Sequence, residues 1–302
     1  MRVLIAGCGY VGLPLGQELI QQGHEVFGLR RSATAENELK AAGLQPLFGD
    51  VTQPETLARL PREFDWVVNC VAAGGDAENY RLVYLQGTRN LIEWLAPHPP
   101  KKFVYTSSTS VYGQIDGSPV KESSPTEPIA ETAKILVETE SVLLAAVREK
   151  KFPAIILRVA GIYGPDRGHG FRQFLKNEAR IEGDGSRVMN MIHRDDLINC
   201  IIAALKSGRA GEIYNAVDDE PVSQVNFFQW LAGTVGKYPP PSEPENPAEN
   251  RKRGVTNKRV SSRKLKMELG CQFKYPNFRK GYSAEILRLE RAGELHVLPD
   301  VR

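Results

Sequence analysis

Three glycines follow a short apolar stretch at the start of the chain. Residues 2–6 (RVLIA) have the composition of a buried strand, and residues 14–23 (PLGQELIQQG) have the apolar spacing of a helix that ends at a glycine. Between them Gly7, Gly9 and Gly12 form the spacing G-x-G-x-x-G. Here the first glycine permits a tight turn, the second lets the backbone approach a pyrophosphate, and the third lets helix and strand pack closely. The alternative is a glycine turn without a ligand, but the order strand, loop and helix favours a dinucleotide site.

Apolar runs rich in β-branched residues recur along the chain and alternate with amphipathic stretches. The runs with the composition of buried strands are residues 2–6, 25–29, 65–70, 102–107 and 154–159. Strands that are almost continuously apolar are typical of a parallel sheet covered by helices on both faces, and right-handed crossovers then favour a doubly wound order. Residues 189–193 and 212–217 are two further strand-like pieces, and we expect both on the far side of the same sheet. The predicted fold class is therefore α/β, a Rossmann-type doubly wound parallel sheet.

The regular alternation loosens after about residue 164. We predict that residues 1–165, rejoined by residues 188–218, form the Rossmann domain that binds the dinucleotide. Residues 166–187 and 219–302 look like an insertion and a tail, and we expect them to form a smaller C-terminal lobe that binds the substrate.

Composition argues against several other classes of protein. The chain has 39 Lys and Arg against 36 Asp and Glu, and its basic residues are scattered, so we expect no nucleic-acid partner. The four cysteines lie far apart without a C-x-x-C pair, so neither a metal site nor a disulfide framework is predicted. No apolar run is long enough to span a bilayer, and the amino terminus lacks the features of a secretory leader. We therefore expect no membrane partner and a cytoplasmic location.

The second predicted strand ends at two arginines. An NAD-specific site places a carboxylate here, about 20 residues beyond the glycine loop, to bind the 2′-hydroxyl of the adenosine ribose. Arg30 and Arg31 stand there instead, and guanidinium groups bind a 2′-phosphate through charge-assisted hydrogen bonds. The predicted cofactor is therefore NADP, with NAD less favoured, although either arginine could merely solvate the strand end. Asp50, after the third strand, is a candidate adenine contact or a turn-forming residue.

Six landmarks occur in order along the chain: GCGYVG, VVNCVAAGG, SSTSVYG, LRVAGIYGP, MNMIHRDDL and IYNAVDDEP. Together they resemble the extended short-chain dehydrogenase/reductase superfamily, of the NAD-dependent epimerase/dehydratase type. The closing stretches NKRVSSRKLKMELG and YPNFRKGY look more like its atypical, YeeZ-like branch. The resemblance implies an NAD(P)-dependent oxidoreductase or epimerase, and it adds these cofactor contacts: Tyr10, Val11, Val51, Val71, Ala72 and Ala73.

Typical members of this superfamily carry a Ser or Thr, a Tyr, and a Lys four residues after that Tyr. Ser108 matches the Ser/Thr position, and Lys134 matches the Lys that holds the cofactor's ribose. The Tyr position falls on Ala130, which cannot move a proton. Because loss of a positioned general acid/base costs about a hundred- to ten-thousandfold in rate, activity requires a substitute group.

Three residues are candidates for that substitute: two tyrosines and Glu131, which follows Ala130 and could instead be a favourable charge in the first turn of a helix. Tyr112 lies four residues after Ser108, and Tyr163 lies at the predicted carboxyl end of a strand, where ligands bind in such sheets. Both could instead be packed structural residues. The expected substrate contacts are Ser108, Thr109, Arg158 and His193. Arg158 could bind an anionic group or form a salt bridge, and His193 could titrate near neutrality or serve as a hydrogen-bonded core residue.

Two functions from different classes fit these residues. The first is an NADP-dependent enzyme acting on a nucleotide-activated sugar or a similar polyol, which Ser108 and Lys134 favour. The second is a binding protein whose conformation or partner affinity changes with NADP occupancy, which Ala130 favours. Taken together, these residues slightly favour the enzyme over the binding protein. We expect a small-molecule substrate as partner and leave a homodimer open.

Overall fold

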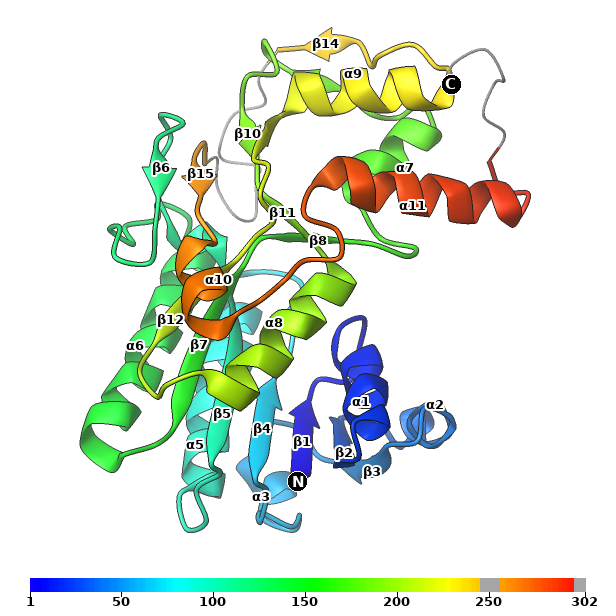
Figure 1. Ribbon diagram of the computed structural model, residues 1–302. Helices are drawn as coiled ribbons and strands as arrows, with labels where there is room; N and C mark the ends of the chain where they lie inside the picture. Colours follow the sequence, from blue (N-terminus) through cyan, green and yellow to red (C-terminus); the bar gives the residue numbers. More distant parts are fainter. Residues whose placement is uncertain (245–255, 296–302) are drawn as a thin grey trace.

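A seven-stranded parallel sheet forms the centre of the larger part of the molecule (Figure 1). The computed structural model describes residues 1–244 and 256–295. The strand order is β3-β2-β1-β4-β5-β7-β12, and every neighbouring pair is parallel. The strands are β1 (Arg2–Ala6), β2 (Glu25–Arg30), β3 (Gln45–Phe48), β4 (Trp66–Asn69), β5 (Lys102–Ser108), β7 (Ala154–Val159) and β12 (Ile213–Ala216). The order reverses between β1 and β4, which confirms the predicted doubly wound Rossmann-type fold.

Helices cover both faces of this sheet. In Figure 1, α1 and α8 lie in front of the sheet, and α5 and α6 lie behind it. The helices of this larger part are α1 (Gly12–Gln21), α2 (Glu36–Ala41), α3 (Pro54–Leu57), α4 (Ala77–Tyr80), α5 (Gly87–Leu95), α6 (Glu131–Lys150), α8 (Arg194–Ser207) and α10 (Arg263–Leu269). A π-helical segment, η2 (Arg81–Gln86), joins α4 to α5, and short 3-10 turns, η1 (Ala33–Ala35) and η3 (Thr109–Val111), follow β2 and β5.

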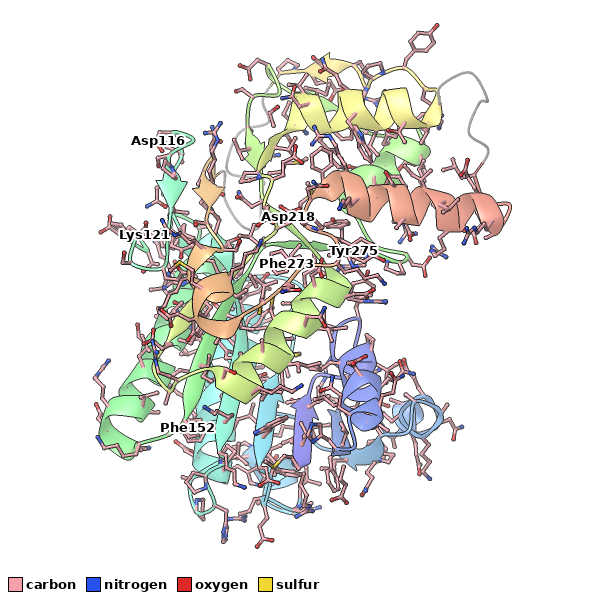
Figure 2. All side chains as sticks on the ribbon, in the orientation of Figure 1. Asp116, Lys121, Phe152, Asp218, Phe273 and Tyr275 are labelled. Atoms are coloured by element: carbon pink, nitrogen blue, oxygen red, sulfur yellow. The ribbon has the colours of Figure 1, made fainter. Side chains whose placement is uncertain are left out.

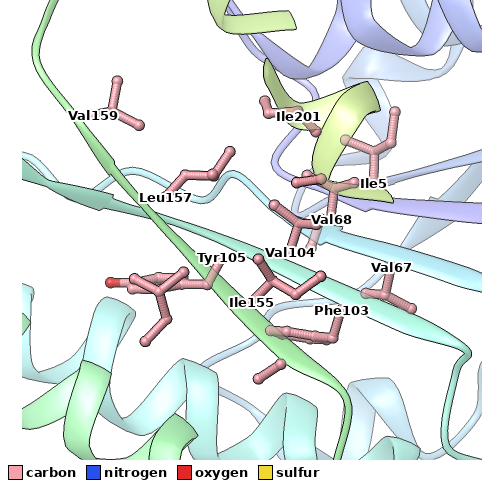
Figure 3. Packing of buried hydrophobic residues seen from close by; sticks show 14 of the residues in the cluster. Ile5, Val67, Val68, Phe103, Val104, Tyr105, Ile155, Leu157, Val159 and Ile201 are labelled. Carbon is pink, nitrogen blue, oxygen red and sulfur yellow. The ribbon is translucent and has the colours of Figure 1, made fainter. Parts of the chain in front are cut away.

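The main apolar core lies between the sheet and these helices (Figure 3). Successive side chains of a strand point to opposite faces. Val104 therefore faces Ile201 of α8, while Phe103 and Tyr105 face the other layer of helices (Figure 3). All three β5 residues are fully buried. Burial on both faces explains why the strands read as continuous apolar runs.

A smaller lobe lies beyond the carboxyl ends of the main strands (Figure 1). Its helices, α7 (His169–Leu175), α9 (Gln224–Val235) and α11 (Phe278–Arg291), enclose a second apolar core rich in aromatic rings. The remaining strands form separate pairs: β8 (Gly161–Tyr163) with β11 (Met191–His193), β10 (Val188–Met189) with β13 (Val222–Ser223), β9 (Ile181–Glu182) with β14 (Ser242–Glu243), and β6 (Pro119–Val120) with β15 (Arg259–Val260).

Two segments lie elsewhere than the sequence pattern predicts. β12 joins the main sheet beside β7 as expected, but β11 pairs with β8 in a separate two-stranded sheet, so the expected place of residues 189–193 in the main sheet was wrong. β11 is buried throughout its three residues, and burial alone does not say which sheet a strand joins. β15 and α10, which we expected in the smaller lobe, pack on the larger core through Val260 and Leu265.

Candidate functional site

A cavity of about 580 Å³ opens along the carboxyl ends of the main strands, across the point where the strand order reverses. Five stretches of chain line most of it: residues 7–11, 29–32, 49–52, 70–74 and 106–108. These stretches follow or end β1, β2, β3, β4 and β5 in turn. In open α/β sheets this edge is where ligands bind, because loops diverge on either side of the reversal.

The glycine loop forms the middle of the cavity wall. Gly7 has φ +94°, which favours glycine, and a side chain there would meet the backbone of Cys70 at 2.7 Å. A side chain on Gly12 would lie 2.3 Å from the Gly7 carbonyl oxygen, so glycine is required where α1 begins. Gly9 differs, because a Cβ built there meets no atom within 4 Å.

The open space at Gly9 lies at the start of α1. Val11, the residue before the helix, provides no side-chain cap. The Leu13 N–H already donates to the Gly9 carbonyl oxygen at 3.0 Å and Pro14 has no N–H, so in the first three residues of α1 the Gly12 N–H is the donor left for a ligand. An anion placed there gains from that donor and from the helix dipole. The residues present therefore fit the pyrophosphate of a dinucleotide. Tyr10 and Val11 also line the cavity.

The two arginines after β2 lie at one end of the cavity. Arg30 donates from Nη1 to the carbonyl oxygen of Cys8, and its Nη2 lies 3.6 Å from a carboxylate oxygen of Glu38. Arg31 is exposed, lines the cavity, and forms no ion pair with any residue in the described ranges. No carboxylate side chain stands at the end of β2, where an NAD-specific site would place one.

The loops after β3 and β4 provide the remaining predicted cofactor contacts. Asp50 lines the cavity, and one of its carboxylate oxygens accepts hydrogen bonds from the backbone N–H (2.9 Å) and the hydroxyl (2.8 Å) of Thr52. The residue therefore shapes its own turn while it faces the cavity. Val51, Val71, Ala72 and Ala73 line the same cavity.

The carboxyl end of β5 brings Ser108 to the cavity wall. Its hydroxyl oxygen accepts a hydrogen bond from the backbone N–H of Ser110 at 3.2 Å and caps the short turn η3. Thr109 is buried at the start of that turn and does not line the cavity. Ser108 is thus half-buried, held by its turn, and open to a ligand on one side.

Helix α6 presents an apolar side chain to the cavity where a lysine was expected. Leu136 lines the cavity. Lys134, two residues earlier, lies on the outer side of the helix: 52% of its side chain is exposed, and its Nζ is 3.7 Å from a carboxylate oxygen of Glu131. Ala130 immediately precedes α6 and does not line the cavity either. Ser108 therefore lines the cavity, and Lys134 does not.

Tyr112 and Arg158 belong to a buried hydrogen-bond network behind the cavity. The Arg158 guanidinium pairs with the Glu140 carboxylate at 2.7 Å and donates to the Tyr112 hydroxyl at 3.0 Å. That hydroxyl in turn donates to the side-chain oxygen of Asn215 at 2.8 Å. Glu140 also accepts from the Ser107 hydroxyl at 2.6 Å. The cavity lining includes neither Tyr112 nor Arg158. Both side chains bond to buried protein groups, as residues with a structural role do.

Tyr163 and His193 lie where the smaller lobe meets the sheet, outside the cavity lining. The Tyr163 hydroxyl donates to the carbonyl oxygen of Asn277 at 3.3 Å. His193 Nδ1 accepts from the backbone N–H of Asp195 and caps α8, and burial lowers the pKa of His193 to about 4. The histidine is therefore neutral at pH 7.

Asp218 occupies the same junction (Figure 2). It is 2% exposed, and its Oδ2 has no hydrogen-bond partner within the described residues. Burial, with the neighbouring charges of Asp219 and Asp196, raises the pKa of Asp218 to about 8. This carboxyl group is consequently protonated in the folded protein at pH 7.

Several cavity residues carried no sequence signal. Tyr80, Val83 and Tyr84, from α4 and η2, line the cavity wall. Their segment matched no motif, and their apolar character fits a packed helix equally well. The rest of the wall is formed by Asn79, Leu136, Val159, Ala160, Ile162, Arg167 and Leu197. In residues 1–244 and 256–295, no cluster of His, Cys, Asp and Glu could hold a metal ion, and no helix is long and apolar enough to cross a membrane.

Comparison with known proteins identifies the family. The family model for the NAD dependent epimerase/dehydratase family matches residues 3–216. Protein YeeZ of Escherichia coli K12 is 28% identical over 288 residues, which cover 91% of this chain and 97% of that protein. A solved structure from Methylobacillus flagellatus, described as an NAD-dependent epimerase/dehydratase, is 33% identical, with a TM-score of 0.76 and coverage of 96% and 98%.

The fold recurs in a more distant enzyme. The dTDP-glucose 4,6-dehydratase DesIV of Streptomyces venezuelae, solved with NAD and TYD bound, superposes with a TM-score of 0.83 at 23% identity and covers 96% of this chain and 97% of its own. The sheet order, the cavity at the strand ends and the family match over most of the chain agree. This chain belongs to the NAD-dependent epimerase/dehydratase family.

Proposed function

We propose that this protein binds NADP in the cavity and acts as an oxidoreductase or epimerase on a nucleotide-activated sugar or a similar polyol. The observation that carries the proposal is the cavity itself, which combines an open glycine loop at a helix start with arginines at the end of β2. NADP would supply hydride transfer. This chain's residues would hold it: the start of α1 at the pyrophosphate, and Asp50 near the adenine.

The preference for NADP over NAD rests on charge at the end of β2. DesIV was solved with NAD bound, so family membership alone does not select the cofactor. Arg31 is exposed and forms no ion pair in the described residues, while Arg30 is turned toward the glycine loop. A 2′-phosphate would bind two guanidinium groups here, whereas an NAD ribose would meet no carboxylate at the end of β2.

The substrate assignment rests on the family and on Ser108. Relatives named as dTDP-D-glucose 4,6-dehydratase and UDP-glucose 4-epimerase share 25–28% identity with this chain. In our proposal the Ser108 hydroxyl, already fixed by its turn, donates a hydrogen bond to the substrate at the carboxyl end of β5. Enzymatic activity requires a general acid/base in place of the tyrosine whose position falls on Ala130.

One observation favours a second function. Leu136 occupies the cavity face of α6, and an apolar side chain cannot assist proton transfer. A protein with an intact cofactor cavity but a weak proton-transfer apparatus could act instead as a sensor of NADP occupancy. Purified protein with NADPH and a panel of UDP-, GDP- and dTDP-sugars decides between the two: cofactor oxidation or epimer formation supports the enzyme, and tight NADPH binding without turnover supports the sensor.

The cofactor preference is tested by calorimetric titration with NADPH and NADH. Replacing both Arg30 and Arg31 by alanine should weaken NADPH binding about tenfold or more, because each guanidinium lost removes charge-assisted hydrogen bonds to the 2′-phosphate. NADH binding should change much less. Arg59→Ala, an exposed arginine outside the cavity, serves as the charge control. Equal losses for both nucleotides would contradict the 2′-phosphate assignment.

A further inference from the structure

Arg167 extends from the base of the smaller lobe to the cofactor cavity, which it helps to line. It lies on a tight turn after β8, in which Gly164 and Arg167 exchange two backbone hydrogen bonds of 3.1 and 3.0 Å. Gly164, Asp166 and Gly168 all have positive φ, so the turn has a defined and unusual backbone shape. No sequence motif or family landmark singled out this arginine.

The turn is attached to the glycine loop through Tyr10. The Tyr10 hydroxyl donates to the carbonyl oxygen of Pro165 at 2.9 Å. The Arg167 guanidinium lies over the Tyr10 ring, with its carbon 4.8 Å from the ring centroid. Tyr10 directly follows Gly9, whose open side is where a pyrophosphate fits. Arg167 is therefore held beside the phosphate-binding part of the cavity.

The charge of Arg167 is not neutralised within the described residues. Arg194 also lies over the Tyr10 ring, at 5.2 Å, but it pairs with Asp195 at 3.1 Å. Arg167 forms no ion pair in residues 1–244 and 256–295, and its side chain is exposed. A guanidinium that is fixed by stacking and lacks a carboxylate partner is suited to bind a phosphate, since phosphate accepts two parallel hydrogen bonds from it.

We propose that Arg167 binds the diphosphate of the dinucleotide from the side opposite the helix start of α1. This inference rests on the proposed cofactor site and goes beyond it, because it makes the smaller lobe a direct contributor to cofactor binding. The turn is tied to α11 on its other side: the Asp166 backbone N–H donates to Glu285 at 3.2 Å, and the Asp166 carboxylate pairs with Arg288 at 2.6 Å. Cofactor occupancy thus strengthens the attachment between the two lobes.

The test compares Arg167→Met with Arg148→Met by titration of NADPH and NADH. Methionine keeps an apolar chain over the Tyr10 ring and removes the charge, and Arg148 is an exposed arginine in the last turn of α6, outside the cavity. Arg167→Met should weaken both nucleotides by the same factor, about ten- to a hundredfold, because both carry the diphosphate. Arg148→Met should bind both as the wild type does.

A ligand without a diphosphate completes the test. Adenosine 2′-monophosphate, measured by displacement of NADPH, should bind Arg167→Met as tightly as the wild type. Arg167→Lys keeps the charge without the planar fork, so its NADPH affinity should lie between those of the wild type and Arg167→Met. This milder variant decides the question if Arg167→Met does not fold.

Three outcomes would overturn the inference. NADPH affinity that is unchanged in both Arg167 variants would show that the arginine does not contact the cofactor. An equal loss of adenosine 2′-monophosphate would show an indirect effect on the whole cavity. If the wild-type protein bound neither NADPH nor NADH, the proposed function would fail and this inference with it, a result distinct from the first two.

Discussion

Replacing Gly9 by alanine separates the folding role of the glycine loop from its binding role. A Cβ at Gly9 meets no atom within 4 Å, so the substitution should leave the free energy of unfolding unchanged or raise it by roughly 0.5 kcal/mol through reduced unfolded-state entropy. A Cβ at Gly12 would lie 2.3 Å from the Gly7 carbonyl oxygen. Gly12→Ala should therefore lower the free energy of unfolding by about 1–3 kcal/mol.

The same methyl group at Gly9 would fill the space into which we place the pyrophosphate. Thermal unfolding with and without NADPH measures both effects. At a ligand concentration of 100 times the dissociation constant, a ligand stabilises the folded state by about 2.7 kcal/mol. For a chain of this size that corresponds to a rise in Tm of roughly 4 °C. The wild type should show this rise, and Gly9→Ala should lose most of it.

Gly233→Ala is the matched control, because it also adds a methyl group where no atom lies within 4 Å, but in α9, away from the cavity. It should keep the full NADPH-dependent rise in Tm. The reasoning is refuted if Gly9→Ala responds to NADPH as the wild type does. It is equally refuted if Gly9→Ala unfolds as readily as Gly12→Ala in the absence of ligand, since the loop geometry would then be different.

Three further changes test other parts of the structure. Lys134→Ala should leave the NADPH dissociation constant within about twofold of wild type in the same titration, because the side chain lies outside the cavity; a large loss would place Lys134 in the cofactor site. Arg158→Met removes the partner of the buried Glu140 carboxylate and should lower the free energy of unfolding in urea by about 3–5 kcal/mol; a change under about 1 kcal/mol would contradict the buried pair. The pKa of Asp218 is about 8 in the folded protein, against an ordinary value of 3.8. Between these two pH values the carboxyl group is protonated in the folded state and ionised in the unfolded state. The free energy of unfolding therefore falls as the pH rises from about 4 to 8. Asp218→Asn should flatten this fall and, at pH 8, exceed the wild type by on the order of 5 kcal/mol in urea unfolding. Glu149→Gln, which replaces an exposed carboxylate of α6, should retain the wild-type pH dependence.

The half of the cavity nearest the amino terminus could be predicted from local pattern. Gly7 has a positive φ and Gly12 approaches the carbonyl oxygen of Gly7, five residues earlier, so these two requirements are local and the spacing of the loop is readable in the chain. Arg30 and Arg31 stand at the carboxyl end of the second strand, and a parallel sheet places the carboxyl ends of its strands at one edge. The structure accordingly brings these loops into a single cavity.

The part of the cavity that α6 lines could not be predicted in this way, because it depends on the rotation of that helix about its axis. Lys134 and Leu136 are two residues apart on α6, which places them on different sides of the helix. Leu136 belongs to the buried face of α6, together with Leu143 and the Glu140 carboxylate that pairs with Arg158, whereas Lys134 is exposed. The pair of Glu140 and Arg158 joins residues 18 apart on different elements, and neither residue's neighbours in sequence disclose it.

The pairing of the short strands likewise could not be read from local pattern. β12 and β11 have similar apolar composition, yet only β12 reached the main sheet. Periodicity of side chains and the backbone needs of a turn are local, so the amino-acid order alone was enough for the fold class, the glycine loop and the charge at the end of β2. Helix orientation, strand pairing and the position of Arg167 beside Tyr10 depend on contacts between residues that are distant in sequence. The packing free energy that selects these contacts comes from the whole core, so it is set only when the chain has folded.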